Sequence, residues 1–180
     1  DRVMASVGLG GFADEIVVSA TQLVRIPDPL SYGQAATMIQ SYATAWFALT
    51  RTTQVAADEW VVVLGGAGGV GLAALDVARA LGAKVISVAS SDERLQQCIQ
   101  RGAHGVINHS TEDVKSRVRE LTGGGADVVV DTVGGALSEP ALRSLRERGR
   151  LEWAREECRV FEEVDDRRDV DDIFSRLPRI

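Results

Sequence analysis

The residues with the clearest chemical meaning form a glycine-rich loop, Gly66-Ala67-Gly68-Gly69-Val70-Gly71, which matches the pattern G-x-G-x-x-G. In this pattern the first glycine permits a tight turn, the second lets the backbone approach a pyrophosphate, and the third lets a helix pack closely on the preceding strand. Backbone N–H groups at the start of that helix then face the phosphates. We therefore predict a dinucleotide-binding loop, the alternative being a turn without a ligand, with contacts from Gly66, Gly68, Gly69, Val70 and Gly71. No lysine follows Gly71, which excludes the phosphate loop of nucleoside-triphosphate hydrolases.

The residues after the second predicted strand bear on which dinucleotide would bind. Sites specific for NAD carry an acid about 20 residues beyond the glycine loop, where it holds the ribose 2′-hydroxyl. Residues 84–91 contain no acid; they end in Ser90 and Ser91, and Arg94 follows. Hydroxyl and guanidinium groups suit a 2′-phosphate, so NADPH is favoured over NADH as the cofactor. A structural alternative is a capping box of Ser90 and Glu93 beside a solvated Arg94.

The elements around the loop alternate between strands and helices. Continuous apolar runs predict strands buried on both faces of a sheet, at residues 60–64, 84–89, 105–108 and 126–131. Apolar residues at helical spacing predict helices that end at Gly82, cover 92–101 and 111–121, and reach Leu145. In the second of these helices Leu95, Cys98 and Ile99 are expected to face inward. This order of elements implies right-handed crossovers and a doubly wound parallel α/β sheet of the Rossmann type.

The two ends of the chain differ from this middle part. Short β-rich runs separated by glycine turns predict antiparallel strands at Arg2-Val3-Met4, Ile16-Val17-Val18 and Leu23-Val24. Residues 151–180 hold ten acids and six arginines without glycine or lysine, which favours a charge-rich helix or a disordered tail. The chain is thus divided into a β segment (1–30), a linking helix (31–55), an incomplete nucleotide-binding domain (56–150) and an acidic tail (151–180).

The composition of the 180 residues excludes several classes of protein. Hydrophobic residues make up 45% and charged residues 26%, the balance of a folded globular protein. The net charge of −6 at pH 7 argues against nucleic acid as a partner, because an acidic surface repels phosphate backbones. No segment is apolar enough to be expected to span a membrane. Two cysteines, and two histidines at an unsuitable spacing, predict no metal site and a reducing, cytoplasmic setting.

Other polar and aromatic residues are assigned structural roles. His104 follows Gly102 in a loop between a helix and a strand, and is interpreted as a turn residue rather than a catalytic base. Asp131 ends a buried strand at the predicted cofactor edge, where we expect it to orient a loop rather than transfer protons. Tyr42 and Trp46 share the apolar stripe of the linking helix, so core packing is expected for both.

From Asp1 to about Gly149 the sequence resembles the zinc-independent quinone oxidoreductases of the medium-chain dehydrogenase/reductase superfamily. Several runs carry the resemblance and agree in order and spacing: GGFADEIVV, SYATAWFAL, VVVLGGAGGVGLAALDVARALGAKV, GAHGVIN and DVVVDTVGG. The resemblance implies a GroES-like antiparallel β domain, of which residues 1–30 are a remnant, and a Rossmann domain. NADPH would bind in the cleft between the two domains. Family members form homodimers, although the strand usually used for dimerisation is not recognised here.

The resemblance also implies roles for residues outside the glycine loop. Thr44 would lie near the nicotinamide, Arg94 would replace the usual lysine at the 2′-phosphate, and Thr132-Val133-Gly134 would line the nucleotide. His109 stands where the family often has a tyrosine close to the adenosine phosphate. The zinc relatives carry a catalytic cysteine and a four-cysteine lobe that have no counterpart here, so metal catalysis is not expected. No catalytic residue is assigned.

The first functional hypothesis is an NADPH-dependent, zinc-independent oxidoreductase that transfers hydride to a small-molecule quinone or enone, with hydrogen-bond donors stabilising the developing oxyanion. An enoyl reductase acting on acyl thioesters is the first alternative. A non-catalytic NADPH-binding fragment is the second, because a charged run beginning at Leu151 replaces the family's hydrophobic strand after Gly149. Under this last hypothesis the chain is a truncated or frame-altered product that is weakly active or inactive.

Overall fold

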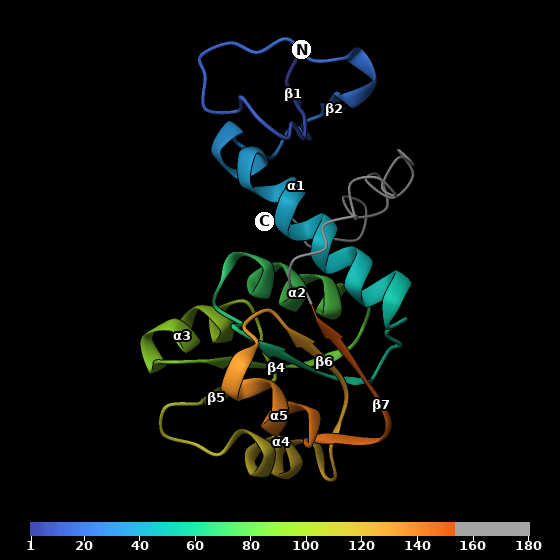
Figure 1. The fold of residues 1–180 in the computed structure, drawn as a ribbon, viewed down its shortest axis with the longest axis vertical. Helices are drawn as coiled ribbons and strands as arrows, with labels where there is room; N and C mark the ends of the chain where they lie inside the picture. The colour runs from blue at the N-terminus through green and yellow to red at the C-terminus, as the bar shows by residue number, and fades with distance from the viewer. Residues whose placement is uncertain (154–180) are drawn as a thin grey trace.

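The body of the protein is a five-stranded parallel sheet with helices on both faces (Figure 1). The computed structural model describes residues 1–153 of the chain. The strands are β3 (Trp60–Leu64), β4 (Lys84–Ala89), β5 (Gly105–Asn108), β6 (Ala126–Asp131) and β7 (Leu145–Trp153). Their order in the sheet is β5-β4-β3-β6-β7, so the chain builds outward from β3 and then crosses to its other side. The predicted doubly wound fold is confirmed, and its direction reverses between β3 and β6.

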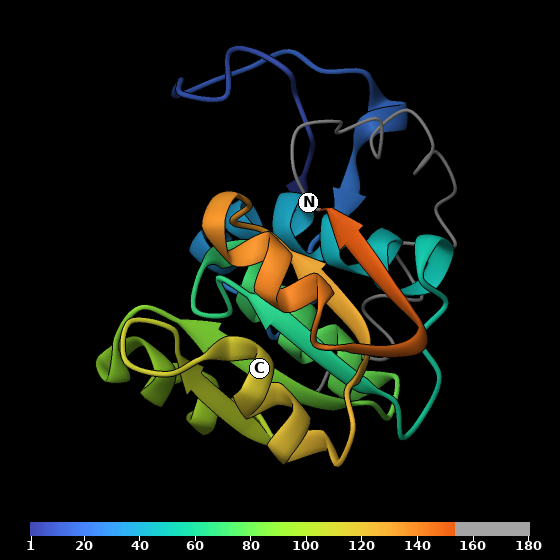
Figure 2. The same cartoon turned by 60° about the horizontal axis from the view of Figure 1, so that its bottom comes forward.

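Two helical layers enclose the sheet. On one face lie α1 (Tyr32–Trp46), α2 (Gly69–Ala80) and α3 (Asp92–Gln100), and on the other lie α4 (Val114–Thr122) and α5 (Ser138–Leu142) (Figures 1 and 2). Alternate residues of β3 serve the two layers: Val61 and Val63 pack with α1 and α2, whereas Val62 and Leu64 pack toward α4 and α5. All four side chains are fully buried, which explains the continuous apolar run of this strand.

A long helical connection joins the N-terminal segment to the sheet. α1 continues directly into a π-helical segment, η2 (Phe47–Thr52), before the chain enters β3 (Figure 1). A capping box begins this helix: Ser31 accepts a hydrogen bond from Gln34 N (3.2 Å), and the Gln34 side chain accepts one from Ser31 N (2.9 Å). The linking helix predicted from the sequence therefore forms and packs across α2.

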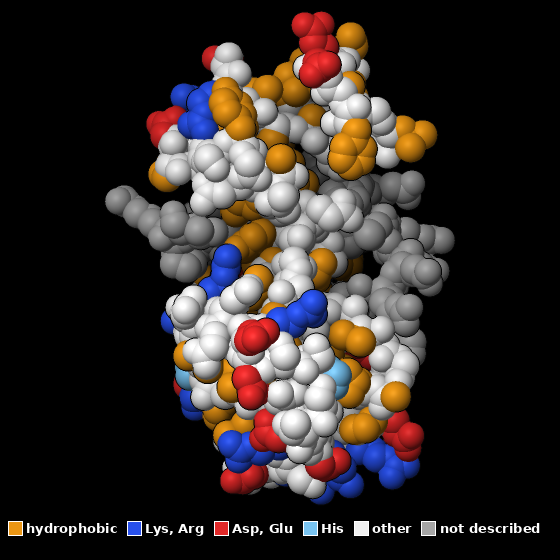
Figure 3. All heavy atoms as spheres, turned by 90° about the vertical axis from the view of Figure 1, so that its left-hand side faces the viewer, with side chains coloured by type: hydrophobic (Ala, Val, Ile, Leu, Met, Phe, Trp, Pro, Cys, Tyr) orange, Lys and Arg blue, Asp and Glu red, His pale blue; other side chains and the backbone are white. Residues whose placement is uncertain are grey.

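The N-terminal segment contains one antiparallel strand pair, β1 (Val3–Met4) with β2 (Val24–Arg25), and a single 3-10 turn, η1 (Ala20–Gln22). The strand predicted at Ile16-Val17-Val18 is wrong. Val17 is 99% exposed, so these residues have no second layer to pack against and the apolar run forms no ladder. Large apolar side chains therefore gather on the surface of this segment, toward the top of Figure 3, while acidic and basic side chains are interspersed over the body below.

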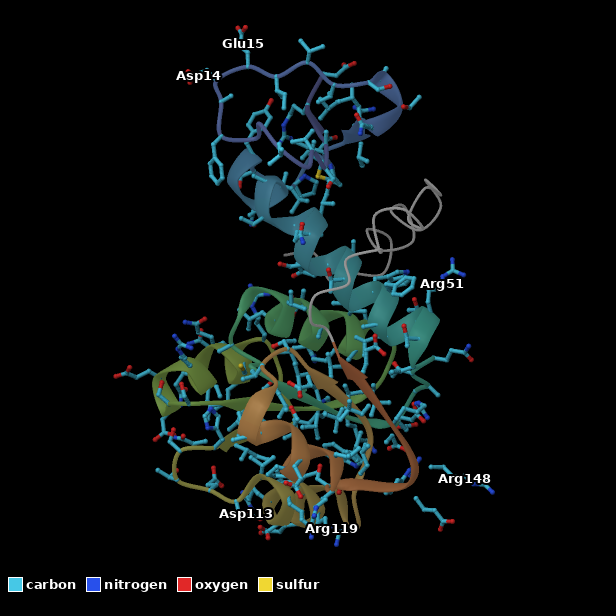
Figure 4. The ribbon with its side chains drawn as sticks, in the orientation of Figure 1. Asp14, Glu15, Arg51, Asp113, Arg119 and Arg148 are labelled. Atoms are coloured by element: carbon cyan, nitrogen blue, oxygen red, sulfur yellow. The ribbon has the colours of Figure 1, made fainter. Side chains whose placement is uncertain are left out.

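Several predicted helix limits also differ from the structure. The helix expected over 111–121 begins at Val114, because Asp113 accepts a hydrogen bond from Ser116 N (2.8 Å) and so caps the helix (Figure 4). Of the three residues predicted to face inward from α3, Leu95 and Cys98 are buried, as predicted, whereas Ile99 is 45% exposed. The helix expected to reach Leu145 is a 3-10 turn, η3 (Gly135–Leu137), followed by α5, which ends at Leu142.

The largest difference concerns β7, where a helix end followed by a charged tract was expected. Residues 145–153 instead form a strand parallel to β6, with Val128 opposite Arg150 and Asp131 opposite Trp153. The register shifts near its middle, where Arg148 has a φ of 65° and projects away from the body (Figure 4). The expected departure at Leu151 is therefore wrong for residues 151–153, while the helix-or-tail prediction for 154–180 falls outside the described residues.

Two ion pairs hold this charged strand against the sheet. Arg146 pairs with Asp127 on β6, whose side chain is only 3% exposed, and Arg150 pairs with Glu59 (2.5 Å) just before β3. Leu151, next to Arg150 in the strand, packs on the core. Charges that look incompatible with a sheet in the sequence are thus matched by acids on neighbouring elements.

Candidate cofactor-binding site

The glycine loop connects the carboxyl end of β3 to α2, as predicted. Gly66 N donates to Val88 O of β4 (2.9 Å), and Gly68 N donates to Gly65 O (2.8 Å), so backbone hydrogen bonds fix the turn. α2 begins at Gly69 without a side-chain cap, which leaves the N–H groups of its first turn without partners inside the helix. These N–H groups, together with the helix dipole, form an arrangement suited to an anion.

Gly71 and Gly68 meet different steric demands. A Cβ on Gly71 would lie 2.2 Å from Gly65 O and 2.8 Å from Gly66 Cα, so only glycine lets α2 approach the loop this closely. A Cβ on Gly68 would meet a single atom within 4 Å, Gly65 O at 3.2 Å. Gly68 and Gly69 are exposed, and the space beside Gly68 is open to a ligand. Gly71 thus has the packing role predicted for it, and the pyrophosphate contact of Gly68 stays a prediction with which the open space is compatible.

The remaining loop positions are set by the neighbouring strands. A Cβ on Gly66 would lie 2.8 Å from Ser87 Cβ on β4, and Val70 is half-buried in the first turn of α2. Gly65 was missed in the sequence: its φ is 66°, and a Cβ there would lie 2.6 Å from Thr132 Oγ1. It stands one position before the motif, so the pattern does not include it, although a doubled glycine after a strand marks such a turn.

The segment Thr132-Val133-Gly134 lies against this loop, across the point where the strand order reverses. The Thr132 hydroxyl donates to Leu64 O (2.8 Å) and so joins the ends of β6 and β3. Asp131 is 1% exposed, and its carboxylate accepts from the N–H groups of Val133 (2.9 Å) and Gly134 (2.7 Å). It also accepts from the hydroxyl of Ser138 (2.5 Å). Asp131 therefore orients the loop, as predicted, at the position where doubly wound sheets bind ligands.

The residues predicted for the 2′-phosphate follow the next two strands. Ser90 follows β4, Arg94 lies in the first turn of α3, and His109 follows β5. His109 N donates to Ala89 O (3.0 Å), and Ser110 Oγ donates to Ser90 O (2.9 Å), so the two strand ends are joined. The Arg94 side chain is exposed and forms no ion pair within residues 1–153. Ser90, Arg94 and His109 are thus brought to the same edge of the sheet.

The local helix cap corrects the structural alternative for Ser90. Ser91, not Ser90, is the N-cap of α3 and accepts from Arg94 N (3.5 Å), so the capping box of Ser90 and Glu93 is wrong. Ser90 is left exposed after β4. The acid that follows, Asp92, accepts from Asn108 Nδ2 (2.8 Å) and is thereby engaged with the end of β5.

The linking helix meets the loop at a residue that the sequence did not indicate. Thr44 is half-buried, and its hydroxyl donates to Gln40 O (2.7 Å) within α1, so its role near the nicotinamide stays a prediction. Ser41, one turn earlier, lies against the loop: a Cβ on Gly69 would be 3.2 Å from Ser41 Oγ. A lone serine in a helix carries no sequence signal for such a contact.

A polar cluster around the buried Asp76 fixes α1 on α2. The Tyr42 hydroxyl donates to Asp76 Oδ2 (2.6 Å), and Arg101 Nη1 donates to the same oxygen (2.5 Å). Asp76 is 5% exposed on α2, and burial together with the bond to Asp76 raises the pKa of Tyr42 to about 12. Trp46 is buried in the core, as predicted, whereas Tyr42 adds a hydrogen bond to its packing.

His104 and Cys98 have the structural roles expected for them. His104 Nδ1 accepts from Val85 N (3.1 Å) at the start of β4, and burial, with Arg79 and Lys84, lowers its pKa. Cys98 is fully buried, and burial raises the pKa of its thiol. Within residues 1–153 no group of three His, Cys, Asp or Glu could hold a metal ion, and no helix there is long and apolar enough to cross a membrane.

Comparison with known proteins defines the class to which this fold and loop belong. Residues 69–152 match the family described as zinc-binding dehydrogenase. The chain is 42% identical over 153 residues to quinone oxidoreductase-like protein 2 of Bos taurus. The matched residues make up 84% of this chain and 44% of that protein. The chain therefore spans less than half the length of this relative. Class and fold are those of the medium-chain dehydrogenases/reductases.

Solved structures narrow the assignment. The quinone oxidoreductase of Thermus thermophilus, solved alone and with NADPH, is 28% identical with a TM-score of 0.83, covering 99% of this chain and 63% of that one. The CurK enoyl reductase is 28% identical with a TM-score of 0.71, covering 76% and 41%. The chain belongs to the quinone oxidoreductase family of this superfamily, as its sequence motifs indicated.

Proposed function

We propose that this chain is the cofactor-binding part of an NADPH-dependent oxidoreductase that reduces a quinone or enone. The main support is the set of exposed Ser90, exposed Arg94 and half-buried His109, which two adjacent strand ends bring together beside the glycine loop. A hydroxyl, a guanidinium and an imidazole are donors suited to a phosphate, and Asp92, the acid that follows Ser91, is bonded to Asn108. The complex of the Thermus relative with NADPH supports the same cofactor.

The residues present fit a dinucleotide along the carboxyl edge of the sheet. The N–H groups of Gly69, Val70 and Gly71 would hold the pyrophosphate, and the open side of Gly68 leaves room for it. Thr132-Val133-Gly134, and Thr44 from the linking helix, would flank the nicotinamide half. When bound, the nicotinamide supplies hydride to an electron-poor carbon of the substrate. The chain's own contribution is to bind and orient, with Asp131 holding the loop in place.

Substitution of Arg94 tests the choice of cofactor. If the Arg94 guanidinium pairs with the 2′-phosphate, Arg94→Ala should weaken NADPH binding by ~1.5–3 kcal/mol, the usual value for a charged hydrogen bond, and leave NADH binding nearly unchanged. Calorimetric titration measures both ligands. Arg119→Ala, on α4 across the sheet, is the matched control and should change neither affinity. Equal losses of NADPH and NADH affinity in Arg94→Ala would refute the assignment.

An enoyl reductase is the second candidate, favoured by the structural similarity to the CurK enoyl reductase. Steady oxidation of NADPH with 1,4-benzoquinone supports the first function, and oxidation with a crotonyl thioester supports the second. Binding without turnover on either substrate would support a non-catalytic fragment. The cytoplasmic setting and the family's homodimer stay predictions that fractionation and sedimentation can test.

A further inference from the structure

Ser41, on the linking helix, lies against the glycine loop without a hydrogen-bond partner for its hydroxyl among the described residues. It is half-buried, its hydroxyl forms no hydrogen bond with residues 1–153, and it lies 3.2 Å from the place of a Cβ on Gly69. Gly69 is the first residue of α2, and Cα–Cβ bonds in a helix tilt toward its N-terminus. The Ser41 hydroxyl therefore borders the space in front of the first turn of α2, where N–H groups would receive a phosphate.

The next residue of α1 fixes this position. Tyr42 is anchored by its hydrogen bond to Asp76, and Asp76 lies seven residues after Gly69, on the same face of α2. Arg101 holds the same Asp76 oxygen from the end of α3. Since an unpaired buried carboxylate is costly, Asp76 keeps both donors, and α1 is held at a fixed height along α2. The contact at Gly69 is thus set by the anchor at Asp76.

We propose that Ser41 binds the pyrophosphate of the cofactor through its hydroxyl, and that the Tyr42–Asp76 hydrogen bond is the device that positions it. The proposal rests on the proposed dinucleotide-binding function. It makes the linking helix part of the cofactor site, so that pyrophosphate binding and the placement of α1 on α2 depend on each other. Tyr42 is a positioning residue and touches no ligand itself.

Titrations with three ligands test the role of Ser41. Ser41→Ala should weaken NADPH and NADH alike, by about tenfold, because both contain the pyrophosphate and a hydrogen bond to a charged group is lost. Adenosine 2′-monophosphate, which has no pyrophosphate, should bind Ser41→Ala as it binds the wild type. Thr37→Ala is the matched control: this hydroxyl lies one turn earlier and bonds only to its own helix. It should change none of the three affinities.

A double-mutant cycle tests the positioning role of Tyr42. Tyr42→Phe should weaken the binding of NADPH by about threefold and leave the binding of adenosine 2′-monophosphate unchanged. Tyr42→Phe and the double mutant with Ser41→Ala will both be less stable to urea than the wild type. In the Ser41→Ala background the same substitution should cause no further loss of NADPH affinity, because Tyr42 acts through Ser41. Equal losses in the two backgrounds would show that Tyr42 supports the fold only, and would overturn its positioning role.

The outcomes separate this proposal from the function on which it rests. If the wild type binds neither dinucleotide, the proposed function fails and the role of Ser41 fails with it. If the wild type binds NADPH and Ser41→Ala binds it equally well, only the role of Ser41 is refuted. A loss confined to NADPH, with NADH unaffected, would also refute it, since the 2′-phosphate would then be the group contacted.

Discussion

Gly68 and Gly71 allow folding and ligand binding to be separated within one loop. In Gly71→Ala the new Cβ would lie 2.2 Å from Gly65 O, whereas such contacts in proteins stay above 3.0 Å. α2 would have to move outward by roughly 1 Å, and its residues Ala74 and Val77 are fully buried against the sheet. Overpacking of this kind costs about 1–3 kcal/mol. Because backbone atoms are the obstacle, we expect the free energy of unfolding to fall by about 3 kcal/mol.

Gly68→Ala should have the opposite profile. The backbone at Gly68 is extended (φ −82°, ψ 171°), a conformation open to any residue, and the new Cβ would meet one carbonyl oxygen at 3.2 Å. We expect the free energy of unfolding to change by less than ~1 kcal/mol. The methyl group would occupy the open side of the loop, where the pyrophosphate must approach the backbone. Dinucleotide affinity should therefore fall at least tenfold, and Gly68→Val should abolish it.

Urea unfolding followed by far-UV circular dichroism measures the first quantity, and calorimetric titration with NADPH measures the second. Gly33→Ala is the control, because a Cβ at this position in the first turn of α1 has nothing within 4 Å. It should leave dinucleotide affinity unchanged and should not lower the free energy of unfolding, because alanine favours a helix more than glycine does. Unchanged affinity in a folded Gly68→Ala variant would show that the loop is only a turn. Unchanged stability in Gly71→Ala would refute the steric argument for α2.

Two further predictions concern groups held by hydrogen bonds. His104 Nδ1 accepts from Val85 only while unprotonated, and burial, Arg79 and Lys84 lower its pKa, so the unfolded chain binds the proton more readily. This contribution to the free energy of unfolding is present above the ordinary pKa of about 6.5 and is lost as the pH falls below it. In His104→Gln the free energy of unfolding, measured by urea denaturation, should therefore depend less on pH between 7.5 and 5. A pH dependence as steep as that of the wild type would contradict this. Asp131→Ala should lower the free energy of unfolding by about 2–4 kcal/mol, since two backbone donors lose their acceptor. Asp131→Asn keeps one acceptor oxygen and should lower it less. Equal urea midpoints for Asp131→Ala and the wild type would show that the loop needs no anchor.

The central strands could be predicted because their environment is uniform. β3, β4 and β6 are covered on both faces, so burial alone selects continuous apolar residues such as Val61 to Leu64. β7 could not be predicted in this way. Its arginines are compatible with a sheet only because Asp127 and Glu59, far away in the sequence, supply opposite charges. A pattern taken from neighbouring residues contains no information about such partners.

Apolar residues at the surface misled the prediction in the other direction. Ile16-Val17-Val18 and Ile99 satisfy the strand and helix patterns, yet Val17 is fully exposed and Ile99 is 45% exposed. Hydrophobic patterning indicates which side of an element is able to pack, and packing also requires a second layer at that place. The N-terminal segment offers few such layers beyond the cluster around Met4, Ile26 and Met38.

The candidate site divides along the same line. The glycine loop and the segment after Asp131 follow directly from motifs, because the topology of parallel sheets places strand ends at a common edge. Ser41 and the Tyr42–Asp76 hydrogen bond follow from the angle at which α1 crosses α2, which no local spacing encodes. Gly65 lies between these cases, since its need for glycine arises from Thr132, which is distant in the chain.

β6 connects the stability of the sheet to the geometry of the cofactor edge. It carries a buried carboxylate near each end, Asp127 and Asp131, and burial of each is costly unless donors compensate. Asp127 accepts from Trp60 N (2.8 Å) and pairs with Arg146, which fixes β6 between β3 and β7. The Asp131 carboxylate, at the other end, accepts hydrogen bonds from the loop that it orients. β6 cannot slide along the sheet without breaking the contacts of both carboxylates. The ion pairs at the amino edge therefore fix the register that places Thr132 beside Gly65. Because β7 supplies the arginines of these ion pairs, this charged strand helps to shape the nucleotide-binding edge.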